Sequence, residues 1–157
     1  MEAQLVVHST FVIERFYPKP AEKVFAAFAD PAKKRRWFAV GDNHEIEIYE
    51  QNFRVGGVER YQARMTQSSP FPGFVLASET SYLGIETNRR IVSASTMSFG
   101  GKVISAALVT IELVETAEGT DLICTHQGAF FEGADGPQMR EQGWRKLFEQ
   151  LGQELAR

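Results

Sequence analysis

Residues 138–156 read QMREQGWRKLFEQLGQELA, and this stretch decides the fold. The spacing of its large apolar side chains predicts one long helix with a single apolar stripe, formed by Trp144, Leu147, Phe148, Leu151 and Leu155. The charged residues fall on what should be the wetter side: Arg140, Arg145, Lys146, Glu149 and Glu154. Gly143 costs about 1 kcal/mol inside a helix, which a closer approach of helix and sheet would offset. A helix with one apolar stripe needs one surface to cover.

The chain before this helix is rich in strand patterns that could form that surface. Residues 4–17 alternate and are rich in Val, Ile and Phe, which predicts a first strand. Six further strands, joined by short turns, are predicted at residues 44–50, 58–66, 74–86, 89–98, 103–115 and 120–131. Successive strands with short connections form an antiparallel meander. We therefore expect a curved antiparallel sheet of about seven strands wrapped around the long C-terminal helix.

Two short helices are predicted after the first strand. A proline-rich break at residues 18–20 ends that strand, and residues 21–29 carry apolar side chains at helical spacing. Asp30 then caps a second helix, which starts at Pro31 and runs to about Phe38. The order of elements, β-α-α-β-β-β-β-β-β-α, indicates an α+β fold.

Length and charge narrow the class of protein. The 157 residues fit a single domain over 1–157. The net charge of -3 argues against a nucleic-acid-binding protein, because phosphate contacts need a concentrated basic surface. The one basic cluster, residues 33–36, is interpreted as a solvated helix face.

Cysteine content and hydropathy bear on the compartment. Cys124 is the single cysteine, so no internal disulfide forms and a reducing compartment is favoured. Residues 1–10 lack the basic and then apolar pattern of a signal peptide. Residues 91–111 hold one charge, Lys102, but their serines, threonines and the Gly100–Gly101 pair fit two strands around a turn better than a membrane span. We expect a cytoplasmic protein without a membrane span.

Four groups of residues resemble the START-like, or SRPBCC, superfamily, whose helix-grip fold is shared with the birch-pollen allergens. They are FAAFADP at residues 25–31 with Trp37–Phe38, FRVGG at 53–57 with Tyr61, THQG at 125–128, and Gly143–Trp144 with Leu147 and Leu151. Within the superfamily the chain is most similar to the branch named after the activator of the heat-shock-protein ATPase. The resemblance covers about residues 10–155.

This resemblance implies a cavity between the long helix and the concave face of the sheet. Members of the superfamily typically bind lipids, polyketides or other apolar metabolites there, and some relatives are aromatases or cyclases. The namesake of the branch engages its chaperone through a separate N-terminal domain. The 157 residues leave no room for one, so a co-chaperone role is not expected.

Strand alternation predicts which side chains face the cavity. Apolar residues of 120–131 and 58–66 should point inward, and the long helix should cover them. The predicted ligand-binding set is Trp37, Tyr61, Met65, His126, Phe130, Trp144, Phe148 and Leu151. Packing in the core is the alternative role for the two tryptophans, and an exposed cross-strand aromatic is the alternative for Tyr61.

His126 is the polar member of this set with the widest choice of roles. A buried polar group without a partner costs about 1–3 kcal/mol. His126 is therefore a core histidine bonded to a neighbour or water, a polar anchor for a ligand, or a proton carrier. Cys124 has no neighbour in sequence that would lower its pKa, and we expect an inert core residue.

Three functions remain open. The first is a binding module for a small apolar molecule, and the second is a cyclase- or aromatase-like enzyme that uses His126 and Tyr61 as proton carriers. The third is an interaction protein that acts on a chaperone or regulator. His8, His44 and His126 are far apart in sequence, so neither a metal nor a cofactor is expected, and no catalytic residue is assigned. A homodimer is an open alternative to a monomer.

Overall fold

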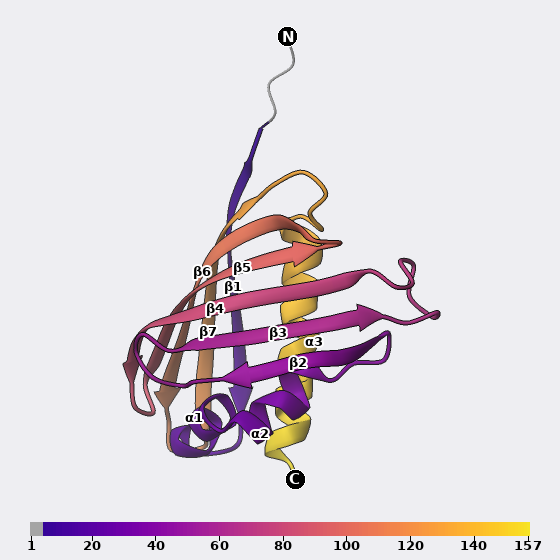
Figure 1. The fold of residues 1–157 in the computed structure, drawn as a ribbon. Coiled ribbons are helices and arrows are strands. Elements are labelled where there is room, and N and C mark those ends of the chain that lie inside the picture. The colour runs from indigo at the N-terminus through magenta and orange to yellow at the C-terminus, as the bar shows by residue number, and fades with distance from the viewer. Residues whose placement is uncertain (1–4) are drawn as a thin grey trace.

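The structure, a computed structural model, describes residues 5–157 (Figure 1). Its strands are β1 (Val7–Tyr17), β2 (His44–Gln51), β3 (Val58–Met65), β4 (Val75–Glu86), β5 (Arg90–Phe99), β6 (Lys102–Glu115) and β7 (Thr120–Phe130). Its helices are α1 (Ala21–Ala29), α2 (Pro31–Lys34), the π-helix η1 (Arg35–Ala39) and α3 (Pro137–Leu155).

All seven strands form one antiparallel sheet in the order β1-β7-β6-β5-β4-β3-β2. Strands β2 to β7 follow the predicted meander, and β1 returns to pair with β7, with Phe11 opposite His126. The sheet curls around α3, while α1 and α2 close one end of it (Figure 1). The predicted α+β fold, with a curved sheet of seven strands around a C-terminal helix and two short helices after the first strand, is confirmed.

The alternation of side chains along each strand decides which residues lie in the interior of the fold. In β7, Leu122, Cys124 and His126 are buried, whereas the residues between them are half-buried and the flanking Asp121 and Gln127 are exposed. The predicted inward face of this strand is therefore confirmed. Strand β6 behaves in the same way, since its apolar odd-numbered residues from 109 to 113 are buried.

The C-terminal half of α3 is tied to the rest of the fold by polar contacts around a buried apolar stripe. Phe148 and Leu151 are fully buried. The side-chain amide of Gln150 donates to the backbone carbonyl of Trp37 at 2.6 Å. Glu154 pairs with Arg36 of η1 at 2.6 Å. These contacts fix the second half of the helix against η1.

The second short helix differs from the prediction. Asp30 caps it as expected, because its carboxylate accepts bonds from two backbone N–H groups of the first turn. The α-helix, however, ends at Lys34, and the chain continues as a π-helix to Ala39. There the N–H of Val40 donates to the carbonyl of Arg35, five residues earlier. Trp37 is buried within this wider turn.

Two cations expected on solvated faces are buried, which corrects the sequence interpretation. Lys34 is 8% exposed and its Nζ lies 2.8 Å from the Glu59 carboxylate on β3. Arg140 is also 8% exposed and pairs with Asp135, in the loop before α3, at 2.7 Å. Helical periodicity does not predict that these two side chains are buried, because the carboxylates that pair with them lie outside each helix.

Candidate functional site

A cavity of about 70 Å³ lies between the first half of α3 and the concave face of the sheet. Arg140 and Trp144 of α3 and Lys34 and Phe38 of α2 and η1 form its walls on the helix side. The sheet contributes the other lining residues, from four neighbouring strands: Ser78, Thr80, Ser93, Ser95, Met97, Ser105, Ala107, Val109 and His126. Segments from most of the chain thus meet at one partly enclosed space.

One part of the cavity wall is aromatic and aliphatic. The Trp144 ring centroid lies 6.1 Å from that of Phe38 and 6.4 Å from that of His126. Met97 and Val109 continue this apolar wall on the sheet. Rings that meet at their edges and faces form a surface suited to a flat apolar molecule.

Another part is lined by five hydroxyl groups on β4, β5 and β6. They occupy alternate positions, such as Ser93 and Ser95, so they point to the same face of the sheet. Thr80 Oγ1 donates to Ser95 Oγ at 3.1 Å, and Ser105 Oγ accepts from Arg140 Nη2 at 2.9 Å. Short side chains at these positions leave the space that larger residues would fill.

His126 is buried at the edge of this cavity, with 1% of its surface exposed. Its ring stacks on Phe11 at 4.5 Å between centroids, and Phe130 lies 6.1 Å away on the same strand. Its Nδ1 atom has no hydrogen-bond partner among the described residues. Burial, reinforced by the nearby Arg140 cation, lowers the pKa of His126 to about 4, so the imidazole is neutral at pH 7.

Two cations line the cavity, and each is held from behind by a carboxylate. Lys34 bonds Glu59, and its ammonium lies 4.5 Å from the centroid of the Phe38 ring. Tyr82 also donates to the Glu59 carboxylate. Arg140 donates from Nε and Nη2 to the two oxygens of Asp135 at 2.8 and 2.7 Å. Bonds of this kind fix the positions of both cations at the wall.

Of the eight predicted site residues, the structure brings His126 and Trp144 to this cavity. Trp37 Nε1 instead donates to the Ala27 carbonyl at 2.8 Å, and Tyr61 Oη donates to the Ala39 carbonyl at 3.4 Å. The other four lie in the core or at a strand end, outside the cavity lining: Met65, Phe130, Phe148 and Leu151. A part for these six residues in binding stays a prediction.

Sequence reasoning missed the polar side of the site. The helical patterns predict solvent-exposed positions for Lys34 and Arg140, and the predicted site set contains no serine or threonine. One signal was present in the sequence, because serines and threonines at every second position of 78–80 and 93–95 mark one face of two adjacent strands. No pattern in the sequence shows that these strands meet two separate helices around one cavity.

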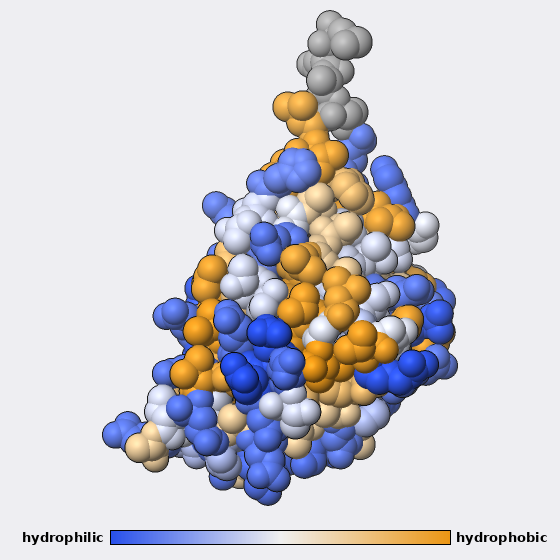
Figure 2. Space-filling model, turned by 90° about the vertical axis from the view of Figure 1, so that its left-hand side faces the viewer, coloured by the Kyte–Doolittle hydropathy of each residue, from blue (hydrophilic) through white to orange (hydrophobic). Residues whose placement is uncertain are grey.

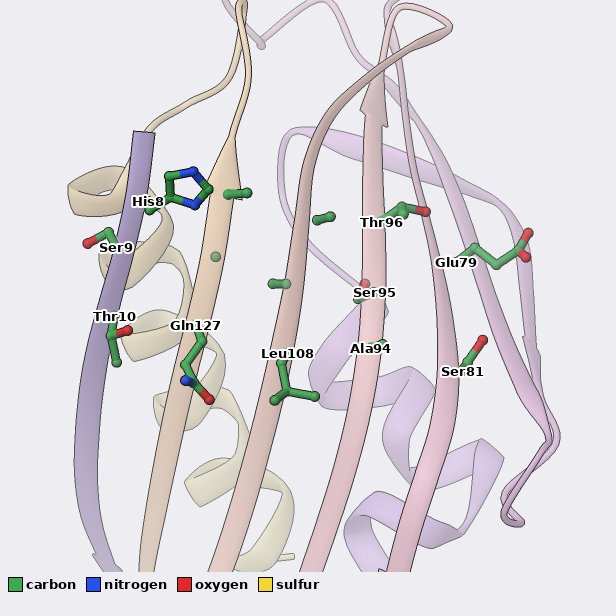
Figure 3. A pocket seen from close by; sticks show the side chains of 14 residues that line it. His8, Ser9, Thr10, Glu79, Ser81, Ala94, Ser95, Thr96, Leu108 and Gln127 are labelled. Carbon is green, nitrogen blue, oxygen red and sulfur yellow. The ribbon is translucent and has the colours of Figure 1, made fainter. Parts of the chain in front are cut away.

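A second and larger hollow, of about 630 Å³, lies on the opposite face of the sheet. Figure 3 shows its side chains on the strands, with the helices behind them. Thr10, Gln127, Leu108 and Ala94 form one cross-strand row along it. From the left-hand side of Figure 1, the surface has a band of apolar side chains among charged ones (Figure 2). This hollow is a broad open surface, whereas the inner cavity gathers buried polar groups, which favours the inner cavity as the functional site.

Other chemistry-bearing groups do not assemble into a site. Cys124 is fully buried, and burial raises the pKa of its thiol to about 12. Within residues 5–157, no three His, Cys, Asp or Glu side chains come close enough together to hold a metal ion. No helix in the same range is long and apolar enough to cross a membrane.

Several solved structures resemble this chain over nearly its whole length. A putative uncharacterized protein from Rhizobium leguminosarum is 32% identical, with a TM-score of 0.90 and 99% of each chain covered. The Mll3558 protein from Rhizobium loti is 41% identical, with a TM-score of 0.82, and the match covers 96% of this chain and 99% of that one. Protein CV1439 from Chromobacterium violaceum is 25% identical, with a TM-score of 0.75 and coverage of 92% and 95%.

A comparison with functionally curated proteins found no significant match. The profile of the family described as activator of Hsp90 ATPase homolog 1-like protein matches residues 18–156, which include every residue that lines the inner cavity. The resemblance inferred from the sequence motifs is confirmed, and the chain belongs to the activator of Hsp90 ATPase homolog 1-like family, with its START-type fold.

Proposed function

We propose that this protein binds a small, largely apolar organic molecule in the cavity between α3 and the sheet. The observation that carries the proposal is His126, a fully buried side chain at the cavity wall whose Nδ1 has no hydrogen-bond partner within residues 5–157. Ligand sites are typically concave and mostly apolar with a few converging polar groups. The aromatic wall around Trp144 and the polar edge at His126 match that description.

The size of the cavity determines how a ligand enters. Its 70 Å³ holds a few water molecules, whereas pockets for drug-sized ligands span roughly 300–1,000 Å³. A ligand with a ring must therefore displace side chains. Met97 and Trp144 are suited to this, because Met is unbranched and flexible and Trp144 is only partly buried. The second half of α3 is bonded to η1, and in the first half Arg140 bonds Ser105 of β6, so we expect the two side chains to move while the helix stays in place.

A ligand screen by thermal unfolding tests the proposal, using flat polycyclic compounds, fatty acids and sterols. A compound at about 100 times its Kd adds about 2.7 kcal/mol to the stability, which corresponds to roughly 5–10 °C in Tm for a domain of this size. A shift of this kind with at least one apolar class is expected. No shift with any class would contradict the proposal.

A matched pair of variants then locates the binding. Ser93 lines the inner cavity, and its neighbour Ala94 lines the outer hollow on the other face of β5. Ser93→Leu fills the cavity and should abolish the ligand-induced shift. Ala94→Leu adds a side chain of the same size to the opposite face and should leave the shift intact. The reverse pattern would assign the binding to the outer hollow.

An enzyme of the cyclase or aromatase type has less support. That reading paired His126 with Tyr61, but the Tyr61 hydroxyl bonds a backbone carbonyl and its side chain lies outside the cavity lining. The His126→Gln variant separates the two functions, because lost turnover with retained binding would favour an enzyme. Action on a chaperone or regulator through the surface, a homodimer and a cytoplasmic location also remain predictions from the sequence.

A further inference from the structure

The charged groups of the inner cavity are all of one sign. Lys34 and Arg140 line it, and no Asp or Glu among the described residues 5–157 does. Their partners, Glu59 and Asp135, contact them from positions outside the lining. A molecule in the cavity therefore meets the two cations directly, with the two carboxylates behind them.

Both cations keep hydrogen-bond donors that no acceptor within residues 5–157 uses. An ammonium group has three N–H bonds, and within the described residues Lys34 Nζ donates one, to Glu59 Oε1. A guanidinium has five, and the bonds of Arg140 to Asp135 and Ser105 engage Nε and Nη2. The Nη1 group of Arg140 is left for another acceptor.

Two further observations support a preference for an anion at this site. Burial is the main cause that lowers the pKa of His126, and the Arg140 cation adds to it while Asp135 opposes it, so the cation lies close enough to act on the imidazole. Ser93 and Ser78 add hydroxyl donors on the sheet side. Arg140 is itself more than nine-tenths buried, so its interaction with an anion would be weakly screened by solvent.

We infer that the ligand of this cavity carries a carboxylate, which binds Arg140 and Lys34 while its apolar part contacts Trp144 and Phe38. The inference rests on the proposed function and names the chemical class of its ligand, an aryl or other compact apolar carboxylic acid. A carboxylate matches the planar donor fork of a guanidinium. Burial of one anion costs free energy unless it is paired, and here the remaining N–H donors of both cations can bond it.

The test compares aryl carboxylates with their own carboxamides, from benzoate and benzamide to naphthoate and naphthamide. Each pair has nearly the same shape and differs in charge. Affinities are measured at pH 7 by calorimetry on the full chain. We expect each acid to bind at least about tenfold more tightly than its amide, since charge-assisted hydrogen bonds are about twice as strong as neutral ones.

Variants of Arg140 assign the preference to the cavity. Arg140→Gln should remove most of the tenfold preference, and Arg140→Lys, which keeps the charge, should retain part of it. Arg145→Gln is the matched control, because Arg145 lies on the same helix, is exposed and pairs with Glu141 outside the cavity. If Arg140→Gln does not fold, the ratio of acid to amide affinities of the unaltered protein still tests whether the ligand carries a carboxylate.

The outcomes separate the two proposals. Acids that bind more tightly than amides, with a preference lost in Arg140→Gln but not in Arg145→Gln, support the inference. Equal binding of acids and amides overturns it and leaves the proposed function standing, as does binding of neutral apolar compounds alone. A complete lack of binding by these pairs and by the wider screen overturns both.

Discussion

The hydroxyl group of Tyr17, at the end of β1, donates a 2.7 Å hydrogen bond to the backbone carbonyl of Phe148 in the middle of α3. Both residues are buried. The bond joins positions 131 residues apart and holds the C-terminal helix against the edge strand of the sheet. Burial accordingly raises the pKa of the Tyr17 hydroxyl, which remains protonated as the donor.

Removal of this hydroxyl should cost stability. Tyr17→Phe is expected to lower the free energy of unfolding by about 1 kcal/mol, the usual net contribution of one hydrogen bond, as measured by urea denaturation. Tyr49→Phe is the control, because the Tyr49 hydroxyl is buried and no described residue forms a hydrogen bond with it. That variant should be neutral or more stable. Equal losses in the two variants would show that the Phe148 contact has no special part in stability.

Gly143 offers a stabilising substitution. From the sequence we expect that the small size of Gly143 lets the helix lie closer to the sheet. The structure shows that this expectation is wrong. A Cβ atom at Gly143 would meet no atom within 4 Å, and the residue is exposed. Gly143→Ala should therefore raise the free energy of unfolding by about 0.4–1 kcal/mol. Gly136→Ala, at a φ of 88°, should lower it, and a destabilised Gly143→Ala would contradict the helix geometry.

The buried pair of Lys34 and Glu59 should respond differently to single and double substitution. Glu59→Gln leaves the Lys34 ammonium buried without an anionic partner, which should cost about 3 kcal/mol or more. Lys34→Met combined with Glu59→Gln removes both charges and should recover most of that loss. Denaturant melts of the three proteins check this, and a double variant as unstable as the single one would refute the charge-based explanation.

His126 makes stability depend on pH. Its pKa is about 4 in the folded protein and 6.5 ordinarily, so the unfolded chain binds a proton at higher pH than the folded chain. The stability gained from neutral His126 is therefore fully present above pH 6.5 and is lost as the pH falls toward 4. The loss should be on the order of 3 kcal/mol.

Two variants isolate this effect from the titration of carboxylates. His126→Phe keeps an aromatic ring against Phe11 and should flatten the stability curve between pH 6.5 and 4. His8→Gln changes an exposed histidine and should leave the curve as it is. Unfolding curves at several pH values give the comparison, and parallel curves for all three proteins would mean that His126 is not the group responsible.

Patterns within single helices and strands were enough to predict most of the fold. The stripe at Phe148 and Leu151 predicted the buried face of α3, and alternation predicted the inward position of His126. The cap at Asp30 was also predicted, and its carboxylate accepts bonds from two backbone N–H groups of the first turn. Each of these follows from the period of one helix or strand, or from one capping residue, so local sequence is enough.

The candidate site depends instead on how elements meet. Lys34 and Arg140 were assigned to solvent, because their carboxylate partners come from a strand and a loop that periodicity does not place. Tyr61 faces inward as predicted but lies outside the cavity lining, since its position in the sheet relative to α3 decides that. The volume left under the helix is likewise a result of packing between elements.

The most direct test of ligand binding under α3 follows the methyl groups of isotope-labelled methionines by NMR during titration with a compound from the screen. Met97 lines the inner cavity, Met139 is 64% exposed on α3, and Met65 lies at the end of β3 outside the cavity lining. We predict a saturable shift of the Met97 resonance, with Met139 and Met65 little changed. A saturating ligand that moves Met139 or Met65 and leaves Met97 in place would contradict binding in this cavity.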